Sequence, residues 1–433
     1  MAQSKQDLKL NLYNIQPHFC NASVVLPTYL VDALYNQASL SQKKNIHTYG
    51  FQKGTTPLGY IEQNFKSNLL EHLKEFLLKY FVISFLYKEL HDQKILIAGE
   101  PRITDIMVQP HHPAEFHFEL SLAPLIELNQ WKEFLFKAPK RKNYKDIDRQ
   151  VESFIKEELD FMKQTSSDLI GFYDWINFDL ALINNQHEYI LNHYKQNLWL
   201  KIGDEEADIP FQEEFSTKKV GTIFYSNNQC FQEYFSNQFD THYNFHIVIT
   251  DHVPHSFFNL EQFKHHFRLK NNKDIQQKLI EIFSYRNDLS QRRAMVEDAL
   301  HLLLAKHSFE VPNYLILRQQ KTVLEAVQNN PDYHVYKTQP DFKNNVRLLA
   351  EKQAKETLLI DKIALEEEIS LSAQDLKSYL NLTKRARTKE FIYFHPPMTK
   401  LKGQEVPLPA ELLKQACLRE KTLNTIIYHL TRK

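Results

Sequence analysis

Hydrophobic positions in the N-terminal quarter of the chain predict two helices beside a small sheet. Helical patterns cover Thr28 to Lys44 and Tyr60 to Leu90, and residues 115–122 alternate apolar and polar side chains as a half-buried strand does. Residues 22–26 are suited to pair with that strand. The apolar positions of the second helix are Ile61, Phe65, Leu69, Leu73, Phe76, Tyr80, Ile83 and Tyr87. We therefore expect residues 1–127 to form an α+β domain, in which a sheet packs against a long helical hairpin.

The middle of the chain predicts a helix followed by several short strands. An amphipathic helix is expected from Asp146 to Met162. The strand candidates are 175–183, 197–202, 222–226 and 243–250. Residues 131–143, which precede the helix, are irregular and basic, as is typical of a solvated linker. We expect residues 128–167 to be linker and helix, and residues 168–255 to form a compact half-barrel domain.

From Leu260 onward the pattern is almost entirely helical. The longest predicted helix has apolar residues at three- and four-residue steps, without Gly or Pro. Pro312 is suited to begin a helix, and Ser372 and Asp375 have the spacing of a capping box. The predicted helices cover 275–303, 342–368 and 410–430. Residues 256–433 therefore predict an all-α domain made of spaced arms.

Three of the eight glycines lie within ten residues between the two predicted hairpin helices, at positions 50, 54 and 59. Glycine permits positive φ, and Pro57 fixes the end of the turn. Phe51 and Lys53 should then project from a tight, exposed loop. An aromatic ring and a cation displayed together suggest a docking tip. A plain loop with incidental glycines is the alternative.

The loop and a second motif resemble trigger factor, the bacterial nascent-chain chaperone. The family motif Gly-Phe-Arg-x-Gly-x-x-Pro is matched in this chain except at its arginine, where Gln52 stands. Far downstream, Phe309-Glu-Val-Pro312 resembles the motif of the family's C-terminal domain. The missing arginine removes one cation able to grip phosphate or carboxylate. The resemblance implies that the ribosome-binding residues are Gly50, Phe51, Gln52, Lys53, Gly54 and Pro57.

The resemblance also implies an FKBP-like peptidyl-prolyl isomerase domain over residues 168–255. Isomerisation is rotation about an amide bond, and its barrier falls when the carbonyl is twisted in a dry aromatic pocket. The candidate pocket residues are Tyr189, Ile209, Phe211, Tyr234 and Phe245. These residues also fit the core of a small β domain. Because Leu180 stands where the family has a pocket aromatic, we expect weak isomerase activity or none.

The composition limits which binding partners and which cellular compartment we expect. Lys plus Arg equals Asp plus Glu at 53 each, so no overall field draws the chain to nucleic acid or to an anionic membrane. Three scattered cysteines favour a reducing compartment. We find no signal-peptide pattern and no apolar stretch of membrane-spanning length, so the cytoplasm is expected and no membrane partner.

Cofactor and metal sites have little support in the sequence. The tightest histidine set, His242, His246, His252 and His255, has no cysteine or acidic ligand at a suitable spacing. A Walker loop, which would bind ATP, is also missing. We expect no cofactor and no metal.

These observations predict an ATP-independent holdase that binds nascent or unfolded polypeptide at the ribosome. Alternatives are a ribosome-independent chaperone or assembly factor, and an enzyme with prolyl isomerisation as its main activity. Candidate client-binding patches, each of which also fits burial between helices, are 302–304, 348–349, 358–360, Phe391, Tyr393 and Phe394. The oligomeric state stays open, with a homodimer as one option.

Overall fold

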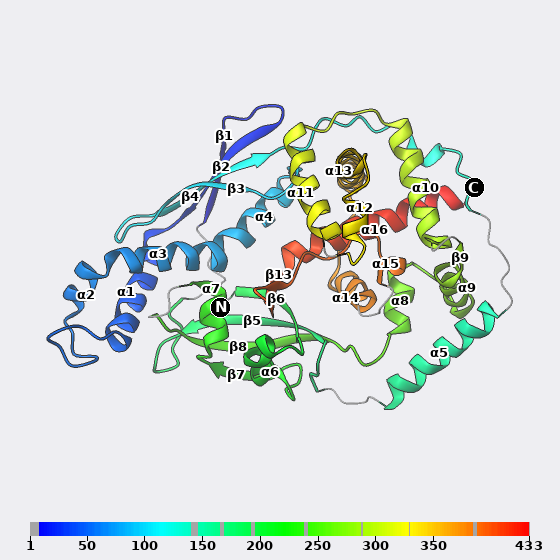
Figure 1. The fold of residues 1–433 in the computed structure, drawn as a ribbon. Helices are drawn as coiled ribbons and strands as arrows, with labels where there is room; N and C mark the ends of the chain where they lie inside the picture. Colours follow the sequence, from blue (N-terminus) through cyan, green and yellow to red (C-terminus); the bar gives the residue numbers. More distant parts are fainter. Residues whose placement is uncertain are drawn as a thin grey trace.

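Three regions follow one another along the chain (Figure 1). They are a sheet with a helical hairpin, a second sheet with short helices, and an assembly of helices. The computed structural model describes residues 8–139, 146–164, 169–191, 195–237, 241–286, 289–328, 330–383 and 388–432. This arrangement confirms the predicted α+β multidomain class. Within the described residues, no helix combines the length and the apolar character needed to cross a bilayer.

The N-terminal sheet has four antiparallel strands in the order β1-β2-β4-β3. Their bounds are Lys9–Tyr13 for β1, Phe19–Leu26 for β2, Arg102–Met107 for β3 and Ala114–Ser121 for β4. The predicted pairing of residues 22–26 with residues 115–122 is confirmed, since Val24 lies opposite Phe116 in the register. Both side chains are fully buried. The two outer strands were not predicted.

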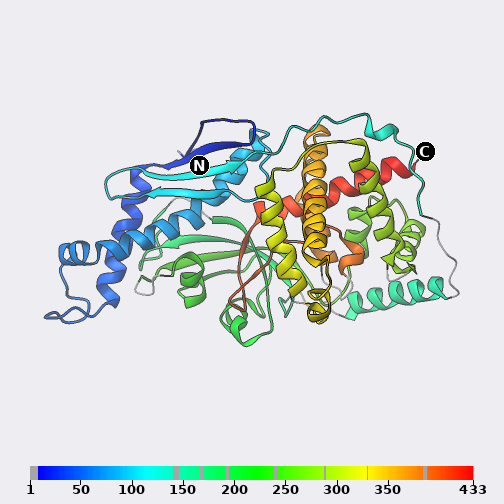
Figure 2. The same ribbon diagram turned by 45° about the horizontal axis from the view of Figure 1, so that its top comes forward.

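The hairpin begins with α1 (Thr28–Asn45), as predicted, and returns through several helical segments. Phe65 has a φ of −115°, which separates α2 (Leu58–Asn64) from α3 (Lys66–Leu77). The π-helical turn η1 (Leu78–Val82) then joins α3 to α4 (Ile83–Asp92) without interrupting the helix. We call α3, η1 and α4 together the hairpin rod. The rod lies between the N-terminal sheet and the second sheet in both ribbon views (Figures 1 and 2).

The predicted linker is only partly solvated where the structure describes it. Trp131, in the short 3-10 helix η2 (Trp131–Glu133), is 3% exposed and lies edge-on to His429. Phe134 and Phe136 pack against the same cluster of C-terminal side chains. The expectation of a solvated connector is therefore wrong for these aromatic side chains, whereas Lys132, Leu135 and Lys137 are exposed as expected. Residues 140–143, with most of the basic side chains, lie outside the described residues.

Helix α5 (Ile147–Gln164) leads to the middle sheet, whose strands follow the order β13-β6-β5-β8-β7. The strands are β5 (Trp175–Ile183), β6 (Lys195–Lys201), β7 (Ile223–Ser226), β8 (Asn244–Val253) and β13 (Leu408–Pro409). Four of them confirm the predicted strands. The fifth, β13, comes from the C-terminal region and covers the edge of β6, where Leu408 pairs with Trp199. Short helices η3 (Glu206–Asp208), α6 (Ile209–Phe215) and α7 (Gln229–Phe235) complete this region.

The C-terminal region is helical, but the long helix predicted over residues 275–303 is divided in two. A two-stranded turn, β9 (Tyr285–Arg286) and β10 (Leu289–Ser290), separates α9 from α10. The Ser290 hydroxyl accepts a hydrogen bond from the Arg293 amide at 3.1 Å and so caps α10. The helices are α8 (Leu260–His266), α9 (Asn272–Phe283), α10 (Gln291–Lys306), α11 (Asn313–Gln328), α12 (Tyr333–Tyr336), α13 (Phe342–Glu366), α14 (Ala373–Leu382), α15 (Thr388–Phe391) and α16 (Ala410–Thr431). The short hairpin β11 (Lys400–Leu401) and β12 (Gln404–Glu405) precedes β13.

A buried ion pair holds the centre of this helical region. Arg292 on α10 donates to the Glu420 carboxylate on α16 at 2.7 Å, and the two side chains are 3% and 0% exposed. The same carboxylate accepts the Tyr393 and Phe394 amides at 2.9 and 3.0 Å. Because both charged side chains are buried, loss of either charge would leave the other uncompensated. The predicted capping box at Ser372 and Asp375 is also confirmed.

Helices α11 and α13 lie side by side as an arm that ends at α12 (Figures 1 and 2). Val323, Val346 and Ala350 form a small apolar cluster of their own between the two helices. The Gln319 amide donates to Gln353 across the pair at 2.8 Å. We call residues 313–354 the arm.

Candidate functional site

The loop between α1 and α2 has the conformation that its glycines predict. Gly50 and Gly54 have φ of +82° and +84°, and a Cβ added at either would meet no atom within 4 Å. Each glycine is therefore needed for its backbone angle rather than for lack of space. The Thr55 amide donates to the Gln52 carbonyl at 3.0 Å and closes a tight turn that contains Gly54.

The loop presents its side chains to solvent at the end of the hairpin farthest from the C-terminal helices (Figures 1 and 2). Phe51 is 38% exposed, with its ring 5.4 Å from that of Tyr60. Gln52 and Lys53 are exposed as well, and Pro57 directly precedes α2. Thr56 is fully buried and anchors the loop through its hydroxyl, which contacts that of Thr48. All six predicted ribosome-binding residues thus lie together on one projecting loop.

The five candidate isomerase residues do not gather on one surface. Phe211 and Phe245 are buried, and both pack on the ring of Phe231. Tyr189 and Ile209 are exposed by 46% and 43%. Tyr189 lies edge-on to His246, the residue after Phe245, and neighbouring residues of a strand point to opposite faces of the sheet. Tyr189 and Phe245 therefore lie on opposite sides of β8.

Tyr234, the fifth candidate, is half-buried beside the hairpin rod. Burial raises the pKa of its hydroxyl, and the nearby Glu411 carboxylate adds to the effect. Its backbone carbonyl accepts a hydrogen bond from the Lys79 ammonium at 2.7 Å. The neighbouring Phe235 ring lies 5.0 Å from Phe76 of the rod. Aromatic side chains of the N-terminal hairpin thus pack against this part of the middle region.

Sequence reasoning missed this role of Phe76 and Tyr80. A signal for it was present, because residues 72, 75, 76, 79 and 80 recur at helical spacing and mix aromatic with ionisable side chains. That mixture differs from the aliphatic pattern of an ordinary buried helix face.

The predicted client-binding patches differ in exposure, and Leu302, Leu304, Tyr393 and Phe394 are half-buried. Leu303, Leu358, Leu359, Ile360 and Phe391 are buried among the C-terminal helices. Leu348 and Leu349 on the arm are instead 54% and 42% exposed. Other exposed apolar side chains of the arm and its tip are Tyr314, Leu317, Val335 and Tyr336. The arm therefore displays apolar groups to solvent along its length.

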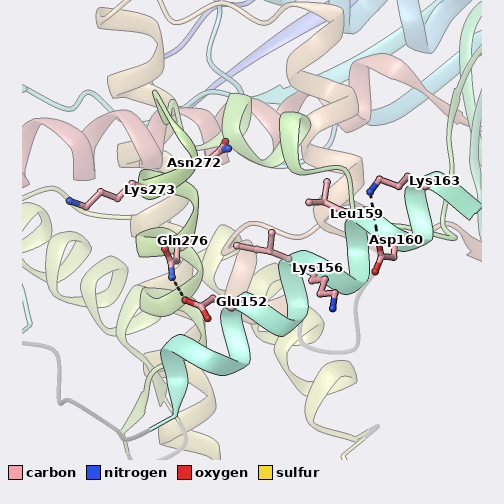
Figure 3. A pocket seen from close by; sticks show the side chains of 9 residues that line it. Glu152, Lys156, Leu159, Asp160, Lys163, Asn272, Lys273 and Gln276 are labelled. Atoms are coloured by element: carbon pink, nitrogen blue, oxygen red, sulfur yellow. Dashed lines mark hydrogen bonds and ion pairs between the residues drawn. The ribbon is translucent and has the colours of Figure 1, made fainter.

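A groove of about 580 Å³ lies between α5 and α9 (Figure 3). Its apolar side chains are Ile155 and Leu159 on α5. At its rim, Gln276 donates to Glu152 at 3.3 Å. Lys163 lies 3.9 Å from Asp160, also on the rim. The groove therefore offers apolar contact and paired polar groups rather than a set of catalytic side chains.

The four histidines weighed as metal ligands do not gather into one set of ligands in the part of the chain that the structure describes. His252 lies 2.7 Å from the Asp174 carboxylate, and the His255 amide donates to the same carboxylate at 2.5 Å. The backbone of His242 bonds to Ser41. Among the residues that the structure describes, no group of three or more His, Cys, Asp or Glu side chains has the geometry to hold a metal.

Comparison with known proteins assigns the chain to a family. The family model described as bacterial trigger factor protein matches residues 9–157, and the model of the trigger factor C-terminus matches residues 270–394. Together these two matches span more than half of the chain. They leave out residues 158–269, which contain most of the middle sheet.

Similar proteins carry the same description over most of their length. The trigger factor of Rickettsia canadensis is 20% identical over an alignment of 390 positions, which covers 83% of this chain and 81% of the relative. That of Campylobacter hominis is 23% identical over an alignment of 441 positions, and the alignment covers 94% of each protein. One solved structure is described as "Promiscuous Substrate Recognition in Folding and Assembly Activities of the Trigger Factor Chaperone", and its chain is 14% identical to this one. The TM-score is 0.38, and the match covers 97% of this chain and 100% of that chain. The two family matches, in the same order along the chain as the loop and the arm that they contain, place this protein in the bacterial trigger factor family as a divergent member.

Proposed function

We propose that this trigger factor is an ATP-independent holdase, which binds nascent or unfolded polypeptides at the ribosome exit. The observation that carries the proposal is the exposed pair Phe51 and Lys53 on a glycine-shaped loop at the end of the hairpin. The ring supplies an apolar contact, and the ammonium pairs with an rRNA phosphate or an acidic side chain of a ribosomal protein. Such a contact weakens as salt is raised.

Co-sedimentation with ribosomes at low salt tests the docking step. The wild-type chain is expected to pellet, and Phe51→Ala/Lys53→Ala is expected to lose at least tenfold in affinity. A matched control is Phe172→Ala/Lys163→Ala, which removes an exposed Phe and an exposed Lys far from the loop. If the wild type fails to pellet, the docking step is wrong, and a ribosome-independent chaperone becomes the better description.

Gln52 allows a test in the opposite direction. The family motif has arginine at this position, and Gln52 is exposed beside Lys53. Gln52→Arg adds a planar cation able to bind phosphate or carboxylate through two hydrogen bonds. We expect tighter ribosome binding from Gln52→Arg, and unchanged binding would mean that the loop does not meet an anionic surface there.

The arm is the proposed client-binding element, because its exposed leucines lie among charged residues and so can hold apolar segments of an unfolded chain. We expect the wild type to suppress aggregation of an unfolded protein without nucleotide, and Leu348→Ser/Leu349→Ser to suppress it less. The control Leu125→Ser/Leu135→Ser removes two exposed leucines outside the arm. No suppression by the wild type at equimolar concentration would remove the holdase proposal.

Isomerase activity is proposed to be weak or lost, and the cytoplasm is proposed as the compartment. The separation of Tyr189 from Phe245 by the sheet supports the first part, and membership in a family of bacterial chaperones supports the second. In a proline-limited refolding assay, we expect the refolding rate with Tyr234→Phe or Phe211→Ala to equal the rate with the wild type. A large rate loss in both variants would favour the isomerase interpretation.

A further inference from the structure

The hairpin rod contacts the middle sheet through one stripe of side chains. His72, Phe76 and Tyr80 follow one another at four-residue steps, and Glu75 and Lys79 lie beside them on the helix surface. All five contact residues of the middle region that lie 100 or more positions away. The contact is thus a surface of the rod docked on a surface of another region, rather than a local turn.

The centre of this contact is aromatic. The Phe76 ring lies 5.0 Å from Phe235 and 5.0 Å from Tyr243, and the Tyr80 ring lies 5.5 Å from Phe235. The Tyr80 hydroxyl donates to the Leu180 carbonyl at 3.2 Å. Aromatic side chains in such arrangements supply most of the binding energy of many protein interfaces.

Polar and ionisable groups surround the aromatic centre. His72 hydrogen-bonds to the Tyr243 hydroxyl at 2.6 Å, and Glu75 accepts the Asn237 amide at 2.6 Å. Lys79 donates to the backbone carbonyl of Tyr234 on α7 at 2.7 Å. At the far end, the buried Lys195 of β6 donates to Ser84 of the rod at 2.5 Å.

Burial of these ionisable groups is unfavourable. It lowers the pKa of Lys195 to about 8 and that of His72 to about 3, and it lowers the pKa of Lys79, although the Glu75 carboxylate opposes the last effect. Lysine is seldom fully buried in a permanent core. By contrast, the other buried side chains of the rod include the aliphatic Leu69, Leu73, Leu77, Leu86 and Leu90.

Glu75 and Lys79, which are partly exposed, give the aromatic contact a polar margin, as in interfaces that form and separate. We propose that the hairpin rod is a displaceable occupant of an aromatic face on the middle sheet, formed by Phe235 and Tyr243, and that the uncovered face binds amphipathic polypeptide segments. The rod itself defines the ligand chemistry: two aromatic residues four positions apart on a helix, with a lysine before the second. The proposal rests on the proposed function only in that the ligand is a polypeptide client.

The test uses the full chain and a fluorescent peptide copied from residues 66–92. Glu75→Ala/Lys79→Ala removes two polar contacts that hold the rod and leaves the aromatic face intact. We expect this variant to bind the peptide at least tenfold more tightly than the wild type does. A control peptide with Phe76→Ala/Tyr80→Ala should not bind to either protein. Lys79→Met, which keeps the packing of the side-chain stem, is the milder variant if the double one fails to fold.

Hydrogen exchange separates the outcomes. Faster exchange of α7 and β8 amides in the variant, together with peptide binding, would support the proposal. Faster exchange without peptide binding would overturn it, because the face would then be open but unable to bind. Unchanged exchange with no peptide binding would show that the contact is a permanent core, and it would also overturn the proposal. A variant that dimerises without binding peptide would overturn it too, because the face would then bind a second copy of the chain. Ribosome co-sedimentation of the wild type, measured separately, tests the proposed function and leaves this result unaffected.

Discussion

The two ends of the hairpin differ in how their structure is determined. At the loop, Gly50 and Gly54 set the backbone locally, and Phe51 is left exposed. Along the rod, Phe76 is fully buried, and its aromatic partner Tyr243 lies far away in the sequence. The loop is suited to meet a surface outside the molecule, whereas the rod meets one inside it. Substitutions at the loop should therefore change binding, and substitutions in the rod should change stability.

The largest effect is expected from Phe76→Ala. This change removes a ring that packs on Tyr80, Phe235 and Tyr243, and loss of a buried Phe costs roughly 3–5 kcal/mol of unfolding free energy. Urea unfolding measures the loss. The matched control is Phe51→Ala at the loop, which should cost less than about 1 kcal/mol. Equal losses in the two variants would contradict the distinction between loop and rod.

The next largest effect is expected in the pH dependence of the unfolding free energy, to which His72 contributes. Burial lowers the pKa of His72 to about 3, against about 6.5 in an unfolded chain. Below pH 6.5 the unfolded state therefore binds more protons than the folded state, and this contribution to stability is lost as the pH falls from 6.5 towards 3. Between pH 7 and pH 5 the loss from His72 is about 2 kcal/mol.

Urea unfolding of the wild type and His72→Gln at several pH values checks this expectation. The His72→Gln variant should lose less stability on acidification than the wild type, because glutamine does not titrate. His266, whose pKa burial also lowers to about 3, stays in both proteins and contributes equally to both. Parallel pH profiles for the two proteins would mean that His72 is accessible to protons in the folded state.

The loop could be predicted from the sequence because its determinants are adjacent. Glycine clustering and Pro57 fix the turn of the loop independently of the rest of the fold, and alternation of side chains over residues 115–122 likewise predicts β4, Ala114–Ser121, within one residue. The division of the helix predicted over 275–303 could not be seen, since Ile282, Leu289 and Val296 continue the helical spacing across the break.

Contacts between distant segments set the remainder of the fold. Helical spacing predicted that Phe76 and Tyr80 are buried, but not that their partner is the middle sheet. The same limit applies to β13, a strand of two residues whose pairing with β6 depends on how the C-terminal region folds back. The candidate isomerase residues show the same limit. Phe211 and Phe245 are aromatic, as a binding pocket requires, but both are buried in a core.

A smaller effect is expected from Gly54→Ala. An alanine at φ of +84° is strained by about 1–2 kcal/mol, although its Cβ would meet no atom within 4 Å. The strain should shift the loop away from its docking shape and weaken ribosome binding several-fold in co-sedimentation. Gly59→Ala is the control, because Gly59 lies in α2 without a positive φ and has open space at its Cβ. Equal binding losses in both variants would mean that loop geometry does not matter.

The smallest change in stability, within about 0.5 kcal/mol, is expected from Lys53→Ala, because the side chain is exposed. Its effect should appear in the salt dependence of ribosome binding instead. Loss of one phosphate contact lowers the slope of log affinity against log salt by about 1. The control Lys44→Ala removes an exposed lysine of the same hairpin outside the loop and should leave the slope unchanged. If Lys53→Ala keeps both the affinity and the slope of the wild type, the lysine faces solvent in the complex, and the exposed ring of Phe51 must carry the docking contact without it.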